Sequence, residues 1–166
     1  MIYLLLILLI AAMVIIAILS QKVKPLSDEY TTVGNINVYK KALLTPNEAA
    51  FYVELRKIIP PQRDISCKCR LEDLMGIPQK APNKNAQRNR IKSRHVDFVI
   101  FDPQTGNVDY VIELDDSSHR PPKKQCEDQF KNMLFAQIGV LLIRIKARQA
   151  YNSSEVYQEI MKNFGS

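Results

Sequence analysis

The chain has 166 residues, a net charge of +6 and three cysteines. An odd number of cysteines excludes a framework that pairs all of them in disulfides, and no repeat or low-complexity tract is present. The residues that follow an apolar N-terminal run suit one domain of ordinary size with a core of its own.

The N-terminal run has no charged side chain from Met1 to Leu19. A helix of about 20 residues is about 30 Å long, which is the hydrocarbon thickness of a bilayer. We therefore predict a transmembrane anchor over residues 1–20 and a linker over residues 21–41. The alternative is a cleaved signal peptide, which the absence of an early Lys or Arg disfavours.

The orientation of this anchor depends on two lysines, Lys22 and Lys24, which follow the apolar run. The positive-inside rule keeps such a flank in the cytoplasm. We therefore expect a single-pass protein of the inner membrane, with the domain of residues 42–166 facing the cytoplasm and its thiols reduced.

The first helix of this domain is expected to start after Thr45 and to end before Pro60. Thr45 is a suitable N-cap, Pro46 fits the first helical position, and Glu48 completes a capping box. Apolar residues at helical spacing share a stripe with Glu48, so a role for Glu48 facing the core stays open beside its capping role.

A strand is predicted next over residues 65–71. Its apolar residues alternate with polar ones, so Cys67 and Cys69 are expected to point to the same side.

The basic residues between Gln79 and His95 account for the whole excess of positive charge. Removing these six leaves as many basic as acidic residues. They are Lys80, Lys84, Arg88, Arg90, Lys92 and Arg94. We predict a loop here that contacts phosphates, either of nucleic acid or of anionic lipid. The alternative is a solvated loop without a ligand. Because the segment has no aromatic residue, base readout from it is not expected.

Two strands with a short connection follow, over residues 95–101 and 108–115. The turn-forming residues 102–107 make the pair a hairpin. A helix over 123–137 ending at Gly139, a strand over 140–145 and a helix over 153–163 complete the domain. A right-handed crossover makes the 108–115 and 140–145 strands parallel. The expected fold is an α/β domain with a small mixed sheet flanked by helices.

Two acidic residues interrupt the apolar hairpin strands. If the turn centres near Thr105, Asp97 and Glu113 face each other across the hairpin, about 5 Å apart at Cβ. Asp115 has the parity of Glu113 and points to the same side. Converging carboxylates predict a Mg²⁺ site, and such an ion can activate water at a phosphoryl group. The alternative is a set of structural ion pairs with basic neighbours. These neighbours are Arg94, Arg144 and Lys146.

From about Leu43 to Ile145 the chain resembles the PD-(D/E)XK, or restriction-endonuclease-like, nuclease superfamily. Val96-Asp97 at a strand end and Glu113-Leu114-Asp115 on the next strand of the hairpin carry this resemblance. The string of residues 111–119, with Asp128 and the strand of residues 139–144, is similar to the domain-of-unknown-function family 2726. It is also similar to the endonucleases of very short patch repair.

The resemblance implies a metal-dependent phosphodiesterase acting on DNA or RNA with Mg²⁺ or Mn²⁺. Asp97 and Glu113 would hold the ion, with help from Glu48 and Asp115. His119 would act as a general acid or base.

The sequence departs from the superfamily at one position, because Asp115 stands where the superfamily has a lysine. Either His119, Lys124 or Lys131 takes over that role, or the domain is an inactive nuclease-fold module that binds nucleic acid or a protein partner at the membrane. Lys131 and Asp128, at i and i+3, have the alternative of a plain pair on the helix surface. A third possibility is an accessory domain whose basic loop lies on anionic lipid.

Overall fold

The computed structural model describes residues 13–15, 37–115 and 122–165. The chain divides into two units, residues 1–41 and 42–166. In the first unit residues 13–15 are helical, and the rest of the predicted anchor and most of the predicted linker lie outside the described residues. No helix within the described ranges is long and apolar enough to cross a bilayer.

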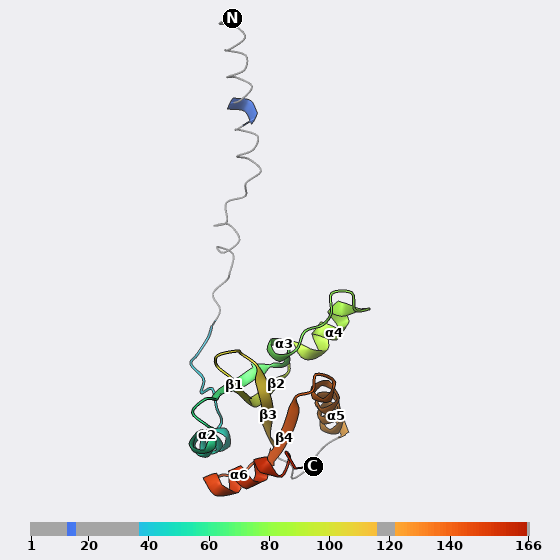
Figure 1. Cartoon of the computed structure of the whole chain (residues 1–166). Coiled ribbons are helices and arrows are strands. Elements are labelled where there is room, and N and C mark those ends of the chain that lie inside the picture. Colours follow the sequence, from blue (N-terminus) through green and yellow to red (C-terminus); the bar gives the residue numbers. More distant parts are fainter. Residues whose placement is uncertain (1–12, 16–36, 116–121, 166) are drawn as a thin grey trace, which may run out of the picture. The chain divides into compact units, whose positions relative to one another are not determined.

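Four strands form one mixed sheet in the order β1-β2-β3-β4 (Figure 1). The strands are β1 (Asp64–Arg70), β2 (His95–Phe101), β3 (Val108–Asp115) and β4 (Leu141–Lys146). β2 is antiparallel to both β1 and β3, whereas β3 and β4 are parallel. The expected mixed α/β sheet is confirmed, and β2 and β3 have the predicted bounds.

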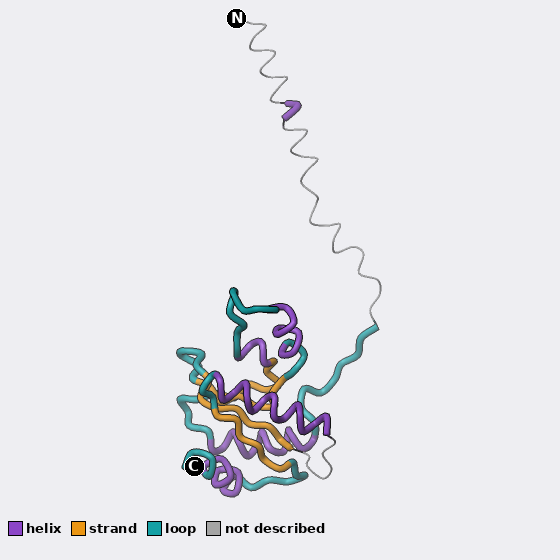
Figure 2. Tube along the Cα trace, turned by 90° about the vertical axis from the view of Figure 1, so that its right-hand side faces the viewer, coloured by secondary structure: helices purple, strands orange, loops and turns teal. Residues whose placement is uncertain are grey.

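Helices cover both faces of this sheet (Figure 2). They are α2 (Pro46–Ile58), α3 (Leu71–Leu74), α4 (Lys84–Ile91), α5 (Pro122–Gln137) and α6 (Ser153–Met161). Phe51 of α2 and Ile160 of α6 share a core with alternate residues of β2, β3 and β4. On the other face Phe135 of α5 packs with Leu71 and Ile91. Each face is apolar because both are covered, which explains the near-continuous apolar runs of β2 and β3.

The start of α2 follows the predicted capping box. The backbone N–H of Thr45 donates to Glu48 Oε2 at 2.9 Å, and the backbone N–H of Glu48 donates to Thr45 Oγ1 at 3.4 Å. Glu48 is therefore held at the first turn, with its second carboxylate oxygen available to another partner.

The basic segment is not the loop that the sequence predicts. Residues 84–91 form α4, and α3 lies directly after β1. Apolar periodicity does not reveal either helix, because α3 has only four residues and α4 is polar apart from Ile91 and one alanine. The two helices are stabilised by the burial of Leu71 of α3 and Ile91 of α4 against the sheet.

The side-chain alternation of β1 breaks at Lys68. This residue has a left-handed backbone (φ 57°) in the middle of the strand. Cys67 consequently packs with the core under α2 and α6, and Cys69 packs with the core under α5. The prediction that both thiols point to one side is wrong, because it assumed an extended Lys68. Cys67, Cys69 and Cys126 form no disulfide.

Candidate functional site

A cleft of about 450 Å³ opens where β3 ends, between the sheet and α5. Its walls are strongly charged. The acidic and basic residues that line it include Asp97, Glu113, Asp115, Lys124, Lys131 and Arg144. Three of the acids that the sequence predicts as metal ligands, Asp97, Glu113 and Asp115, therefore line one cavity.

The hairpin register places Asp97 and Glu113 at the same end of the hairpin. Phe98 pairs with Ile112, and Val99 pairs with Val111, which is the register expected for a turn centred near Thr105. Asp97 directly precedes Phe98 and Glu113 directly follows Ile112, so both acids lie at the same end of the hairpin.

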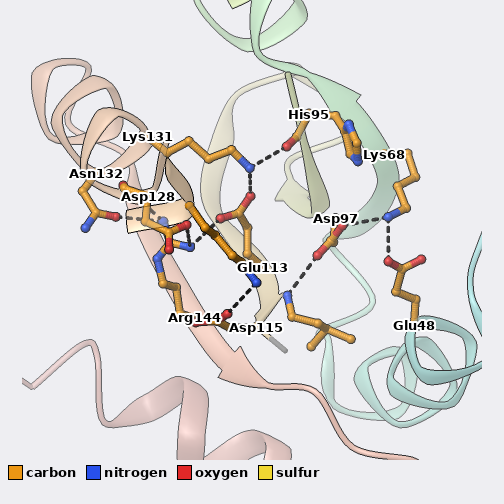
Figure 3. A network of polar contacts seen from close by, with 12 residues as sticks. Glu48, Lys68, His95, Asp97, Glu113, Asp115, Asp128, Lys131, Asn132 and Arg144 are labelled. Atoms are coloured by element: carbon orange, nitrogen blue, oxygen red, sulfur yellow. Dashed lines mark hydrogen bonds and ion pairs between the residues drawn. The ribbon is translucent and has the colours of Figure 1, made fainter. Parts of the chain in front are cut away.

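Glu113 is buried, with 7% of its surface exposed, and both of its carboxylate oxygens accept from cations. Lys131 Nζ contacts Oε1, and Arg144 Nη1 donates to Oε2 at 2.8 Å (Figure 3). Lys131 Nζ also donates to the carbonyl oxygen of His95 at 2.9 Å. Arg144 further donates to Asp128 Oδ1 at 3.0 Å. The ion pair with Arg144 that the sequence leaves open is present.

Asp97 is held from β1 by a residue that the sequence does not single out. Lys68 Nζ donates to Asp97 Oδ1 at 2.8 Å and to Glu48 Oε1 at 2.7 Å (Figure 3). The backbone N–H of Leu114 donates to Asp97 Oδ2 at 3.0 Å. The carboxylate of Asp97 is therefore fixed by one neighbouring strand on each side.

The ion pair between Lys68 and Glu48 raises the pKa of Lys68 and lowers the pKa of Glu48. Partial burial lowers the pKa of Lys68, but the hydrogen bonds to Asp97 and Glu48 outweigh burial and raise it above its ordinary value. Burial raises the pKa of Glu48, but hydrogen bonds from Lys68 and Thr45 outweigh it and lower that pKa. The bridge thus stabilises an ammonium and a carboxylate together.

Asp115, the third acid, lies at the end of β3 and is also 7% exposed. Lys124 Nζ of α5 lies 3.5 Å from its Oδ1. The sequence predicts Lys124 as one candidate to replace the superfamily lysine at whose position Asp115 stands, and Lys124 does line the cleft.

The remaining predicted residues divide into three groups. Lys131 lies in the cleft on Glu113, so its interpretation as one half of a surface pair with Asp128 is wrong; both side chains contact residues of β3 or β4. Glu48 does not line the cleft and reaches Asp97 through Lys68. His119 lies outside the described residues.

Of the basic segment, Arg94 alone lines the cleft. Arg88 Nε pairs with Glu72 at 3.1 Å, and Lys84 Nζ contacts Gln79. Both line a separate hollow beside α3. The six basic residues are therefore not equivalent.

Across the described ranges, no three His, Cys, Asp or Glu side chains gather closely enough to form a metal cluster. Asp97 and Glu113 turn instead toward their own cations. Sequence patterns do not reveal Lys68, but a buried acid without a partner requires a cation from some other element.

The fold and the cleft define a mixed α/β domain with a charged cavity at one end of its hairpin. The chain belongs to the family DUF2726, described as "Protein of unknown function", whose model matches residues 40–163. Searches of the curated proteins and of the solved structures give no significant match.

Proposed function

We propose that this protein is a membrane-anchored, metal-dependent nuclease that hydrolyses phosphodiester bonds of DNA or RNA in the charged cleft. One observation carries the proposal. Asp97, Glu113 and Asp115 reach the same cavity as four lysine and arginine side chains, so anionic metal ligands and cationic phosphate ligands lie together. A phosphodiester bound to a divalent ion needs both kinds of group.

The order of the strands and helices supports this proposal. An antiparallel hairpin with acids at one end, then a helix, then a strand parallel to the second hairpin strand is the order that a restriction-endonuclease-like domain has. We propose that the domain belongs to that superfamily.

The donor set of the cleft fits Mg²⁺ or Mn²⁺. Asp97 and Glu113 offer hard carboxylate oxygens, and Mg²⁺ commonly binds through one or two carboxylates together with water and substrate phosphate. A cluster of three protein ligands is therefore not required. When bound, the ion would activate a water molecule and neutralise charge on the phosphate.

The other residues of the cleft have roles that follow from their contacts. Arg144 orients Glu113, and Lys131, beside the same carboxylate, would stabilise charge on the phosphate in place of the lysine that Asp115 replaces. Lys68 orients Asp97, and Glu48 acts through Lys68 rather than on an ion. His119 remains our proposed proton donor or acceptor.

The membrane part of the proposal comes from the sequence. The apolar run of residues 1–20 would anchor the chain in the inner membrane, and Lys22 and Lys24 would hold the domain in the cytoplasm. The cleft would then act on nucleic acid close to that membrane.

A second candidate is an inactive nuclease-fold module that binds nucleic acid or a protein partner. The observation that favours it is that Asp97, Glu113 and Asp115 each have a cation within ion-pair distance. Such pairs can replace a metal permanently.

The test is cleavage of plasmid and of single-stranded DNA and RNA by the full chain in uncharged detergent, with Mg²⁺ or Mn²⁺. We expect cleavage that EDTA stops and that Asp97→Asn and Glu113→Gln abolish. Asp109→Asn is the matched control, since it removes a carboxylate from β3 at the other end of the hairpin. Binding of these substrates without cleavage by any preparation would reject the nuclease and leave the second candidate.

A further inference from the structure

Two arginines at the rim of the cleft stack on one aromatic ring. Arg90 lies in the last turn of α4, and Arg94 directly precedes β2. Their Cζ atoms lie 4.4 and 5.2 Å from the ring centroid of Phe130 on α5. Arg94 Nη1 also donates to the carbonyl oxygen of Arg90. Contacts with α5, which lies much further along the chain, therefore hold two positive charges side by side.

Neither arginine has a carboxylate partner within the part of the chain that the structure describes. The neighbouring Arg88, in contrast, pairs with Glu72 at 3.1 Å. The negative end of α4 explains a basic residue in its last turn and the hydrogen bond to the Arg90 carbonyl. It does not explain why both guanidinium groups stack on Phe130, where their charges repel.

We propose that Arg90 and Arg94, held on Phe130, form a clamp for backbone phosphates of a nucleic acid strand that enters the cleft. Stacking leaves the N–H edges of a guanidinium group directed outward, where they can donate two parallel hydrogen bonds to a phosphate. Because Arg94 also lines the cleft, a strand bound at Glu113 passes the clamp. This inference rests on the proposed function, since it uses the same cleft.

The position of the clamp favours nucleic acid over a lipid surface. A bilayer is flat and contacts protruding charges, whereas Arg94, Lys131 and Arg144 line one concave cavity. A guanidinium plane can also stack on a nucleobase, as aromatic and arginine platforms do for single strands. Phe130 thus supplies, from α5, the aromatic group that the basic segment itself lacks.

The test measures anisotropy of a fluorescein-labelled single-stranded oligonucleotide with the full chain in uncharged detergent. EDTA is present, so that binding is measured without cleavage. Arg90→Ala/Arg94→Ala is compared with Lys84→Ala/Arg88→Ala, which removes the same charge from the same segment. We expect the clamp pair to weaken binding about tenfold or more, because charge-assisted hydrogen bonds to two phosphates are lost.

The salt dependence separates the clamp from general charge. Two phosphate contacts on a single strand contribute about 1.4 to the slope of log K against log salt concentration, and the clamp variant is expected to lose this amount. The control pair should keep the slope. A labelled duplex measured in parallel shows whether the clamp prefers one form of nucleic acid.

Phe130→Leu tests the stacking itself, because it keeps both charges and most of the apolar bulk. We expect about two- to fivefold weaker binding at an unchanged salt slope, since the cation–π contacts are lost but the charges remain. Arg94→Lys, which keeps the charge without the planar fork, should also weaken binding. Thermal unfolding in the same detergent shows that each variant is folded.

Two results would overturn the clamp. One is an equal loss of affinity in the clamp and control pairs. The other is displacement of the oligonucleotide by soluble dihexanoylphosphatidylglycerol as effectively as by unlabelled oligonucleotide, which would assign the arginines to lipid headgroups. Clamp-dependent binding without cleavage would reject only the nuclease, whereas cleavage with an unchanged KM in the clamp variant would reject only the clamp.

Discussion

The two ends of the β2–β3 hairpin carry similar residue types in different surroundings. At the turn end, Arg63 pairs with Asp102 and Asp109, and about a third of the Arg63 side chain is exposed. At the cleft end, Glu113 is buried between two cations. Water screens the first set of charges and has little access to the second. Charged residues alone therefore do not mark a site; their burial does.

The hollows beside the two ends of the hairpin also differ in the side chains that line them. A hollow of about 610 Å³ at the turn end is lined mainly by apolar groups such as Tyr110, Ile160 and Phe164. The cleft at the other end is lined by charged side chains. A phosphodiester suits the second and not the first, which is why we place the proposed chemistry there.

The largest expected effect is that of Glu113→Gln on stability. This substitution leaves Lys131 and Arg144 partly buried without their shared carboxylate, and removing one partner of a buried ion pair lowers the free energy of unfolding by about 3 kcal/mol. Urea unfolding at pH 7 measures it. Asp109→Asn serves as the control from the exposed end, and an equal loss in both variants would abolish the distinction between the ends.

The next effect concerns the left-handed backbone of Lys68. Lys68→Ala removes the cation between Glu48 and Asp97 and should lower the free energy of unfolding by about 2 kcal/mol. Lys68→Gly loses the same contacts but relieves the backbone, so it should be about 1 kcal/mol more stable than the Ala variant. Two variants of equal stability would show that the backbone at Lys68 is not strained.

A smaller effect is the acid sensitivity that Glu48 provides. Its pKa is lowered from 4.5 in the folded protein, so its contribution to stability is complete well above pH 4.5 and is lost as pH falls through the lower folded value. The free energy of unfolding of Glu48→Gln should therefore fall less steeply than that of the wild type as pH decreases below 5. Urea midpoints across that range provide the measurement, and parallel curves for wild type and variant would contradict the prediction.

Alkaline conditions probe the other end of the same bridge. Because the pKa of Lys68 is raised above 10.5, the stability that it contributes is complete below 10.5 and is lost as pH rises through the folded value. The Lys68→Ala variant should lack this alkaline component. Unfolding midpoints between pH 9 and pH 11.5 would detect it.

The smallest effect is expected at the turn end. Arg63→Gln removes an exposed cation from Asp102 and Asp109, and exposed pairs contribute little because salt and water screen them. We expect an unfolding midpoint close to that of wild type and, if the nuclease proposal holds, unchanged cleavage. A large loss of either would show that the turn end contributes to the site.

Much of the framework was predictable from local patterns. The bounds of β2 and β3, the capping box at Thr45 and the parallel pairing of β3 with β4 agree with the sequence predictions. Each depends on residues close in the chain, on apolar periodicity, or on a connection of fixed handedness. The pairing of Phe98 with Ile112, which neighbour Asp97 and Glu113, follows from the turn between the two strands.

The short helices α3 and α4 were missed for the opposite reason. Each contributes little apolar periodicity of its own, and each is stabilised through one residue, Leu71 or Ile91, that packs on the sheet. The sidedness of Cys67 and Cys69 was wrong because nothing local indicates a positive φ at a lysine.

The sequence by itself determined which acids interrupt the apolar strands and, through the turn, that Asp97 and Glu113 lie at the same end of the hairpin. Only the tertiary structure decided which cations meet them. Lys68 comes from β1 and Lys131 from α5, far along the chain from the acids they contact. Periodicity reports which face a residue occupies, but the partner of a buried charge depends on which element packs above that face.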